Sequence, residues 1–242
     1  MGKPARRKPV ILGIIPARKG SKRLRNKNIR LLLGKPLIAY TIRAALKSRL
    51  LDKTIVSTDD KKIAKIARGY GAEVPFIRPK DLARDDTPTV PVLQHAVERI
   101  ERKMHSKIEI IVVLQPTSPL RTSREIDRSI KKMLDTGADS LASVCKLKDA
   151  SRPELIKQLK RGRLSPYLQY GKDKAKKKEH PRPYQLNGSL YLVKRDILMK
   201  KNTLYGKDTR ALVMDKARCV DIDTQFDLLR ARRLLRKYKK RF

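Results

Sequence analysis

Two carboxylates near the C-terminal end of the chain have a spacing suited to binding a metal ion. In the segment 220–224, Val-Asp-Ile-Asp-Thr, one residue separates Asp221 from Asp223. In a strand, residues two apart point to the same face and lie roughly 6.5–7 Å apart, while their apolar neighbours enter the core. Paired carboxylates are hard oxygen ligands for Mg²⁺, which stabilises charge in nucleotidyl transfer. The alternative is that Asp223 or Thr224 caps a following helix, which would use at most one of the two carboxylates.

The segment from Pro16 to Asn28 is a basic loop directly after an apolar run. A Gly-Ser turn at Gly20 and Ser21 exposes backbone amides, and nearby cations can neutralise a polyphosphate. The loop has neither the GxxxxGK[ST] nor the GxGxxG spacing. A solvated basic loop is the alternative, but the position after a buried strand favours triphosphate binding. The cations of this loop are Arg18, Lys19, Lys22, Arg23, Arg25 and Lys27.

Two further segments offer adaptable hydrogen-bonding groups. In 115–121, QPTSPLR, two prolines fix the backbone among Gln, Thr, Ser and Arg side chains. The same residues could form only a rigid turn with Ser123 as a helix cap. Asn187-Gly188 could face a sugar or could serve only as turn residues. The three histidines form no spacing pattern typical of catalysis.

The elements that must position these residues alternate between strand and helix. We expect strands at 10–15, 54–57, 73–77, 108–114 and 139–145, from their short apolar runs. Helices are expected from Pro36, at 61–70 with Asp59 as cap, at 90–104 and from about Ser123. This order predicts right-handed βαβ units in an α/β fold with a mostly parallel, doubly wound sheet. Ligands bind beyond the carboxyl ends of such strands, where the polar segments fall.

After Lys146 the alternation stops. The Lys-, Pro- and Gly-rich stretch at about 146–186 is interpreted as an inserted arm, with a possible hairpin around Arg161-Gly162. Strands at 188–193 and 218–222 and a helix at 224–238 then follow. We therefore expect a basic tail at 1–9 and a single domain at 10–242 that carries the arm.

The chain is strongly basic, with 61 Lys and Arg against 24 Asp and Glu and a formal net charge of +37. Such a charge attracts nucleic acid, anionic membranes or phosphorylated substrates, although a solvated basic surface is an alternative. Cys145 and Cys219 have no metal-binding spacing and indicate reduced thiols. No apolar run approaches membrane-spanning length, so we expect a soluble, cytoplasmic protein that does not contact the membrane.

Taken together and in order, the segments resemble the acylneuraminate cytidylyltransferases. These are the CMP-sialic acid synthetases, with relatives that act on legionaminic and pseudaminic acids. The resemblance runs from about Val10 to Leu235. It rests on IIPARKGSKRLRNKNIRLLLGKPLIAYTI, IVSTDD, FIRPKDLARDDTPT, LQPTSPLR, LNGSLY and VDIDTQFDL.

This resemblance implies a Rossmann-like nucleotidyltransferase fold, a homodimer joined through the arm, and Mg²⁺-dependent transfer of CMP from CTP. The acceptor would be the anomeric hydroxyl of a nine-carbon acidic sugar, with pyrophosphate released.

By position, the resemblance also implies roles for individual residues. The nucleotide would be held by Arg18, Ser21, Lys27, Asn28 and, near the cytosine, Arg78. The sugar would be lined by Gln115, Ser118, Asn187 and Tyr191. Asp221 and Asp223 would hold Mg²⁺. Catalysis would come from positioning and charge neutralisation by Arg18 and Lys27, with Asp221 as the candidate base.

Some positions depart from the family pattern. Where relatives commonly carry Arg-Arg-Gln before the LNG segment and an Arg next to it, this chain has Lys176-Lys177-Lys178 and Gln185. Lysine keeps the charge but lacks the arginine fork that binds carboxylates, so the identity of the nine-carbon acid stays open.

Two alternatives remain. The related synthase for the eight-carbon sugar Kdo usually has a Gly-Asp-Glu-Pro-like segment in place of LQPTSPLR, so a Kdo cytidylyltransferase is the second choice. An alternative of another class is a nucleic-acid-binding protein, based on the net charge and the basic runs 172–178 and 232–241. Aromatic residues are few and no binding module for RNA or DNA is present, so we expect only non-specific electrostatic binding.

Overall fold

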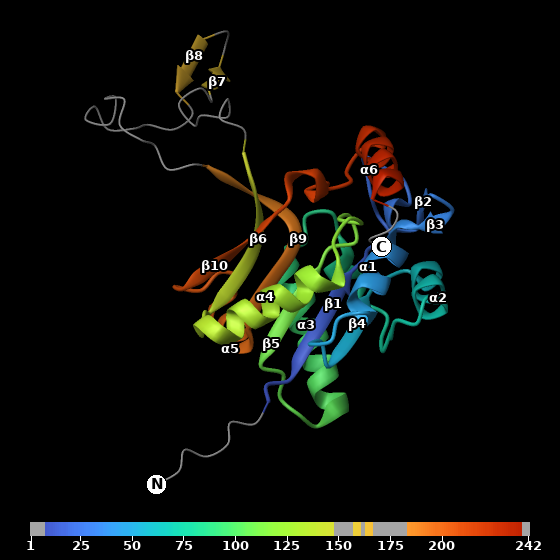
Figure 1. The fold of residues 1–242 in the computed structure, drawn as a ribbon. Helices are drawn as coiled ribbons and strands as arrows, with labels where there is room; N and C mark the ends of the chain where they lie inside the picture. The colour runs from blue at the N-terminus through green and yellow to red at the C-terminus, as the bar shows by residue number, and fades with distance from the viewer. Residues whose placement is uncertain (1–7, 148–156, 161–162, 167–182, 239–242) are drawn as a thin grey trace, which may run out of the picture.

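The computed structural model describes residues 8–147, 157–160, 163–166 and 183–238. Most of them build a six-stranded sheet with helices on both faces (Figure 1). Five strands run in one direction and β9 runs against both of its neighbours. The expected α/β fold with a mostly parallel sheet is confirmed. The strand order is β10 (Thr209–Met214), β6 (Ser140–Lys146), β9 (Tyr184–Lys194), β5 (Ile110–Leu114), β1 (Ile11–Pro16) and β4 (Lys53–Ser57).

Side chains of β1 alternate between two cores, as expected of a strand buried on both faces. Ile11 and Ile15 pack under α1 (Leu37–Leu46), α2 (Lys61–Gly69) and α4 (Ser123–Thr136). Leu12 and Ile14 pack on the opposite face, against α3 (Thr89–Met104) and α5 (Arg195–Lys201). The sheet is therefore covered by helices on both faces, which leaves the carboxyl ends of the parallel strands for ligands.

A third core lies beyond those carboxyl ends. There α6 (Gln225–Lys237) packs through Leu228, Ala231 and Leu235. It meets Leu24 of the basic loop and the short hairpin of β2 (Leu31–Leu32) and β3 (Lys35–Pro36). The short 3-10 helices η1 (Lys27–Ile29), η2 (Lys80–Ala83) and η5 (Lys216–Arg218) also belong to the loops of the molecule. The C-terminal helix thus holds the basic loop in place.

Two expected helix caps are shifted by one residue. The side chain of Asp60, not Asp59, accepts a hydrogen bond from the Ile63 amide at 2.8 Å. Thr122, not Ser123, caps α4 in a capping box with Glu125. The cap is the residue whose side chain reaches the N3 amide, so each helix start is set by this geometry.

Two expected strands were wrong. Residues 73–77 make only isolated bridges, Ile55 with Glu73 and Thr58 with Ile77, because Pro75 has no amide hydrogen for a ladder. The segment 218–222 is no strand either: it follows η5, and Ile222 donates to the Thr117 carbonyl at 2.9 Å. The sheet edge is taken instead by β10, which the sequence pattern did not reveal.

The expected hairpin in the arm is present. β7 (Lys157–Lys160) pairs antiparallel with β8 (Arg163–Pro166). The turn residues Arg161-Gly162, most of the arm, Lys176–Lys178 and residues 1–7 of the basic tail lie outside the described residues. Within the described part of the chain, no helix is both long and apolar enough to cross a membrane.

Arg121 connects three elements from inside the protein. It is only 1% exposed. One of its terminal nitrogens donates to the backbone oxygens of Ser189 at 2.6 Å and Gln115 at 3.2 Å, and the other to the Thr41 hydroxyl at 2.7 Å. These partners belong to β9, the end of β5 and α1. The guanidinium therefore fixes the loop after β5 against its neighbours.

We predict that Arg121→Lys lowers the free energy of unfolding by about 2–3 kcal/mol, because one ammonium group cannot reach three separated acceptors and leaves buried oxygens without donors. Urea denaturation measures this loss. Arg124→Lys, at an exposed position on α4, is the control and should change stability by less than about 0.5 kcal/mol. Equal effects of the two substitutions would show that Arg121 is not a structural tie.

Candidate active site

A cavity of about 180 Å³ opens where the loops after β1 and β5 meet the segment that runs from Arg78 into the first turn of α3. Six of the residues predicted to contact substrates line it: Arg18, Ser21, Lys27, Asn28, Arg78 and Gln115. They come from segments that are nearly 100 residues apart in the chain, so the fold gathers the five predicted nucleotide-binding residues and one predicted sugar-binding residue, Gln115, in one place. Their contacts with a nucleotide stay predictions.

The basic loop is joined to the carboxylate pair by ion pairs. Asp223 accepts from Lys27 at 2.7 Å and from Arg23 at 2.8 Å. Behind this pair, the buried Asn28 donates to the backbone oxygen of Arg18 at 2.8 Å. Lys27 is only 16% exposed, so its ammonium is held at a defined position beside the cavity. A triphosphate entering the cavity would compete with Asp223 for this cation.

Arg78 contributes buried donors that have no acceptor. Its residue exposure is 4%, and neither Nε nor one terminal nitrogen has a hydrogen-bond partner within the described residues. The carboxylate of Asp59 lies 3.9 Å away. Burial lowers the pKa of Arg78, the charge of Arg18 lowers it further, and Asp59 opposes both. Because buried polar groups are normally paired, these donors indicate a place for a polar ligand.

Asp221 and Asp223 project from the third core as expected, although their segment is not a strand. Val220 and Ile222 are 2% and 0% exposed, so the two carboxylates alternate with buried neighbours. Solvent reaches Asp221, yet the surrounding protein removes enough water to raise its pKa. The neighbouring charge of Asp223 raises this pKa further, whereas a hydrogen bond from the Thr117 hydroxyl and the charge of Lys27 lower it.

The cap of α6 uses the side chain of neither Asp221 nor Asp223. Thr224 caps α6 in a capping box with Asp227, whose carboxylate receives the Thr224 amide at 2.8 Å. The alternative role of this segment as a helix cap is therefore filled by Thr224, and it uses neither Asp221 nor Asp223. Within the described residues no group of three or more His, Cys, Asp or Glu could hold a metal. An ion at this pair would need oxygen atoms from a phosphate or water to complete its coordination.

The predicted sugar-binding residues are less closely gathered. The buried amide of Asn187 is occupied: it accepts from Ser143 at 2.6 Å and donates to the sulfur atoms of Met214 and Cys219. The next residue, Gly188, has a φ of +72°, and a Cβ there would lie 3.3 Å from the Asp221 carboxylate. The Asn-Gly turn therefore packs against Asp221, and the contact of Asn187 with a sugar stays a prediction.

Ser118 and Tyr191 do not line the cavity. Ser118 is 2% exposed, and its hydroxyl has no hydrogen-bond partner among the described residues. Tyr191 lies on β9 with its ring edge-on to Tyr205, and burial raises its pKa, with smaller effects from Tyr205 and Asp221. Of the four predicted sugar-binding residues, only Gln115 lines this cavity.

Asp85 is a functional candidate that the sequence analysis missed. Its carboxylate accepts a hydrogen bond from Arg18 and pairs with Lys22 at 2.9 Å. Hydrogen bonds from Lys22 and Arg18 lower the pKa of Asp85. Asp85 lies in the segment FIRPKDLARDDTPT, but the sequence pattern does not show which of the two adjacent acids, Asp85 or Asp86, pairs with the basic loop. Arg84, Thr87, Thr89 and Thr117 line the cavity and were missed for the same reason.

Fold and site together define an α/β nucleotidyltransferase. The pattern of the cytidylyltransferase family matches residues 12–241, and the chain belongs to that family. It is 35% identical to a CMP-N,N'-diacetyllegionaminic acid synthase of Legionella pneumophila over 230 residues, 90% of this chain and 92% of the relative. It is 33% identical to an N-acylneuraminate cytidylyltransferase of Escherichia coli over 90% of this chain and 50% of that protein.

The fold is shared with solved structures of lower sequence identity. A CMP:2-keto-3-deoxy-manno-octonic acid synthetase complexed with CTP matches with a TM-score of 0.70 at 19% identity, covering 94% of this chain and 99% of that chain. A 4-diphosphocytidyl-2C-methyl-D-erythritol synthase matches with a TM-score of 0.68 at 14% identity, covering 94% and 99%. At these identities the likeness establishes the fold.

We predict that Asp85→Asn strengthens the binding of inorganic tripolyphosphate about 1.5- to 5-fold. The substitution frees Arg18 and Lys22 from an exposed ion pair that the polyphosphate must otherwise displace, and exposed pairs of this kind are weak. Isothermal titration calorimetry measures the affinity. Asp86→Asn is the matched control, because this exposed neighbour has no ion pair within the described residues. If both variants bind alike, Asp85 does not compete with the polyphosphate.

Proposed function

We propose that this chain transfers CMP from CTP to the anomeric hydroxyl of a nine-carbon acidic sugar of the sialic, legionaminic or pseudaminic type, with release of pyrophosphate. The observation that carries the proposal is the cavity in which Arg18 and Lys27 lie beside the unpartnered donors of Arg78. Two cations suit a triphosphate, and buried donors suit the acceptor edge of a cytosine. The named relatives favour this class of acceptor.

The chain's own residues would act mainly by binding and positioning. The triphosphate of CTP takes the place of Asp85 at Arg18 and of Asp223 at Lys27, so that two cations held by the protein neutralise its charge. The cavity of about 180 Å³ is smaller than the roughly 300–1,000 Å³ of most ligand sites. Binding must therefore separate the loops that Asp85 joins.

Mg²⁺ fits the carboxylate pair. Asp221 and Asp223 are hard oxygen ligands beside the cation-lined cavity, and Asp221 makes no ion pair within the described residues. When bound, the ion would supply charge neutralisation on the phosphates. The sugar hydroxyl attacks the α-phosphorus, the bond to pyrophosphate breaks, and the hydroxyl proton leaves. Asp221 is the candidate group that takes this proton.

The sugar pocket is the least defined part of the proposal. Gln115 is the candidate that lines the cavity, and Tyr191 lies on the adjacent strand β9. Kdo remains the alternative acceptor. The Kdo-type structural neighbour is 19% identical, which supports the fold and not the substrate. Relatives named for nine-carbon acids reach 35% identity, and this is the reason for preferring them.

Three further assignments belong to the proposal. The enzyme is a homodimer in which the arm at about 146–186 meets the partner subunit, and its site of action is the cytoplasm, where CTP is supplied. Non-specific nucleic-acid binding through the net charge of +37 accompanies catalysis without replacing it. Size-exclusion chromatography with light scattering tests the dimer.

The proposed reaction is tested by pyrophosphate release with CTP and Mg²⁺ over a panel of N-acetylneuraminic, legionaminic, pseudaminic and Kdo acids. We expect turnover with CTP and one nine-carbon acid, and none when ATP, GTP or UTP replaces CTP. Turnover with Kdo alone would support the alternative acceptor. Folded protein that neither binds CTP nor releases pyrophosphate would refute the nucleotidyltransferase mechanism.

We predict that Asp221→Asn lowers turnover by at least about 100-fold, because a metal ligand and proton acceptor is lost. The same variant should be more stable than the ligand-free wild type at neutral pH, because a raised native pKa means that the ionised carboxylate destabilises the fold. This gain should shrink as the pH falls through that pKa, because the wild-type carboxyl group then becomes neutral as well.

The two parts of this prediction are measured by pyrophosphate release and by thermal unfolding between about pH 4 and 8. Asp135→Asn, at an exposed position on α4, should change neither. Wild-type turnover of Asp221→Asn would remove this residue from the metal and base roles.

A further inference from the structure

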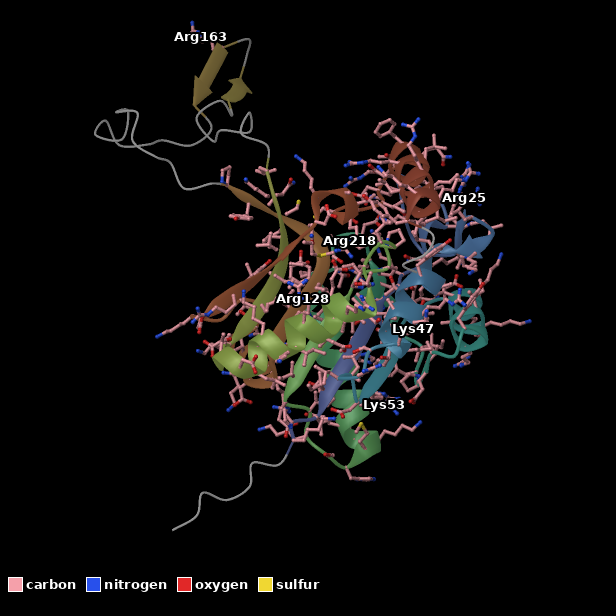
Figure 2. All side chains as sticks on the ribbon, in the orientation of Figure 1. Arg25, Lys47, Lys53, Arg128, Arg163 and Arg218 are labelled. Carbon is pink, nitrogen blue, oxygen red and sulfur yellow. The ribbon has the colours of Figure 1, made fainter. Side chains whose placement is uncertain are left out.

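A second cavity, larger than the catalytic one, lies between α1 and α4. Its volume is about 560 Å³, and it shares no lining residue with the first cavity. The cations that line it are Lys35, Arg43, Lys47, Arg121, Arg124, Arg128 and Arg218. Figure 2 shows the labelled Arg218, Arg128 and Lys47 around the region where α4 and α1 approach each other. No role in the proposed reaction involves this cavity.

The charge of this second cavity is far from balanced. Seven cations face one carboxylate, Glu125, which leaves an excess of six positive charges. Arg218 is the partner of Glu125, at 3.0 Å. The five exposed or half-buried cations from β3, α1 and α4 form no ion pair within the described residues: Lys35, Arg43, Lys47, Arg124 and Arg128. An uncompensated cluster in a concavity attracts anions more strongly than scattered surface charge does.

The floor of the cavity carries buried donors that lack acceptors. Arg121 is 1% exposed, and its Nε has no hydrogen-bond partner among the described residues. The Nε of Arg218 is also buried and unpartnered. The first turn of α4, a helix of 14 residues, also lines the cavity with Thr122 and Ser123. Its free amide groups add partial positive charge at the same place.

We propose that this second cavity binds a phosphorylated small molecule carrying at least two phosphate groups, at a site separate from the catalytic cavity. A volume of about 560 Å³ lies within the roughly 300–1,000 Å³ typical of small-molecule sites and exceeds what one phosphate fills. Guanidinium groups bind phosphate oxygens in a bidentate manner. Four arginines of this cavity are suitably placed: Arg43 on α1, Arg124 and Arg128 on α4, and Arg121 on the floor. The ring of Tyr40 offers an apolar wall for the rest of the ligand.

The two cavities are linked through one buried residue. Arg121 lines the second cavity and donates to the backbone oxygen of Gln115, a residue that lines the catalytic cavity. An anion bound at the free Nε of Arg121 would thus contact the same side chain that holds the backbone of Gln115 at the catalytic cavity. The existence of the second site does not depend on the proposed reaction.

The test measures binding of inorganic tripolyphosphate, without Mg²⁺, by isothermal titration calorimetry. An Arg18→Ala/Lys27→Ala background first weakens the catalytic cavity. In this background we compare Arg43→Gln/Arg128→Gln with the control pair Arg99→Gln/Arg233→Gln, which removes the same charge from exposed positions on α3 and α6. Thermal unfolding of each variant confirms that it is folded.

We expect the background to retain one binding site, the control pair to keep it, and the cavity pair to weaken it at least about tenfold. Tighter binding of CTP than of tripolyphosphate would identify a nucleotide as the ligand class, and equal binding a simple polyphosphate. Equal losses from the two pairs would mean that only the diffuse surface charge binds anions and would overturn the proposal. So would the absence of any binding in the background. Turnover of CTP enters neither comparison, so the result is independent of the catalytic proposal.

Discussion

The buried guanidinium of Arg121 is the interaction on which both cavities depend. Removing a charge from water is costly unless hydrogen bonds replace the lost hydration. The two terminal nitrogens of Arg121 have acceptors on β9, the loop after β5 and α1, and only its Nε has no partner among the described residues. Burial lowers the pKa of Arg121 to about 9, with Glu125 opposing the shift. The group therefore stays charged at neutral pH. Arg121 holds Gln115 in the wall of the candidate active-site cavity and itself forms part of the floor of the second cavity.

The cations of the candidate active-site cavity are held by ion pairs that a bound anion could replace. In the ligand-free protein, Asp85 and Asp223 hold the cations that a triphosphate would need. These acids keep Arg18 and Lys27 in place at a cost in binding, because each contact must be replaced when the nucleotide enters. In the proposed reaction, these contacts could form again as pyrophosphate leaves.

Much of the fold follows from patterns within short stretches of sequence. Apolar runs identified five of the strands, β1, β4, β5, β6 and β9. Caps, helix-start residues and apolar faces identified α1 to α4 and α6, because burial and capping select residue types within a short stretch of sequence. Where the prediction failed, local pattern and global geometry differed. Pro75 prevents the 73–77 run from pairing. β10 has exposed residues at four of its six positions, so its place at the sheet edge left no apolar run. The reversed direction of β9 is a matter of chain connection, which no local pattern records.

The sequence by itself determined the family, the loops that carry polar groups, and the spacing of Asp221 and Asp223, because these depend on residue types and their order. Tertiary structure alone decided which polar groups meet. In the folded protein, Arg78 lines the cavity with donors that have no partner among the described residues. The side-chain amide of Asn187 is hydrogen-bonded to Ser143, and Asp85 rather than Asp86 is the partner of Arg18. Tertiary structure also brought α1 and α4 together around a second basic cavity. Contacts of this kind depend on distances between segments far apart in the chain, and only packing sets those distances.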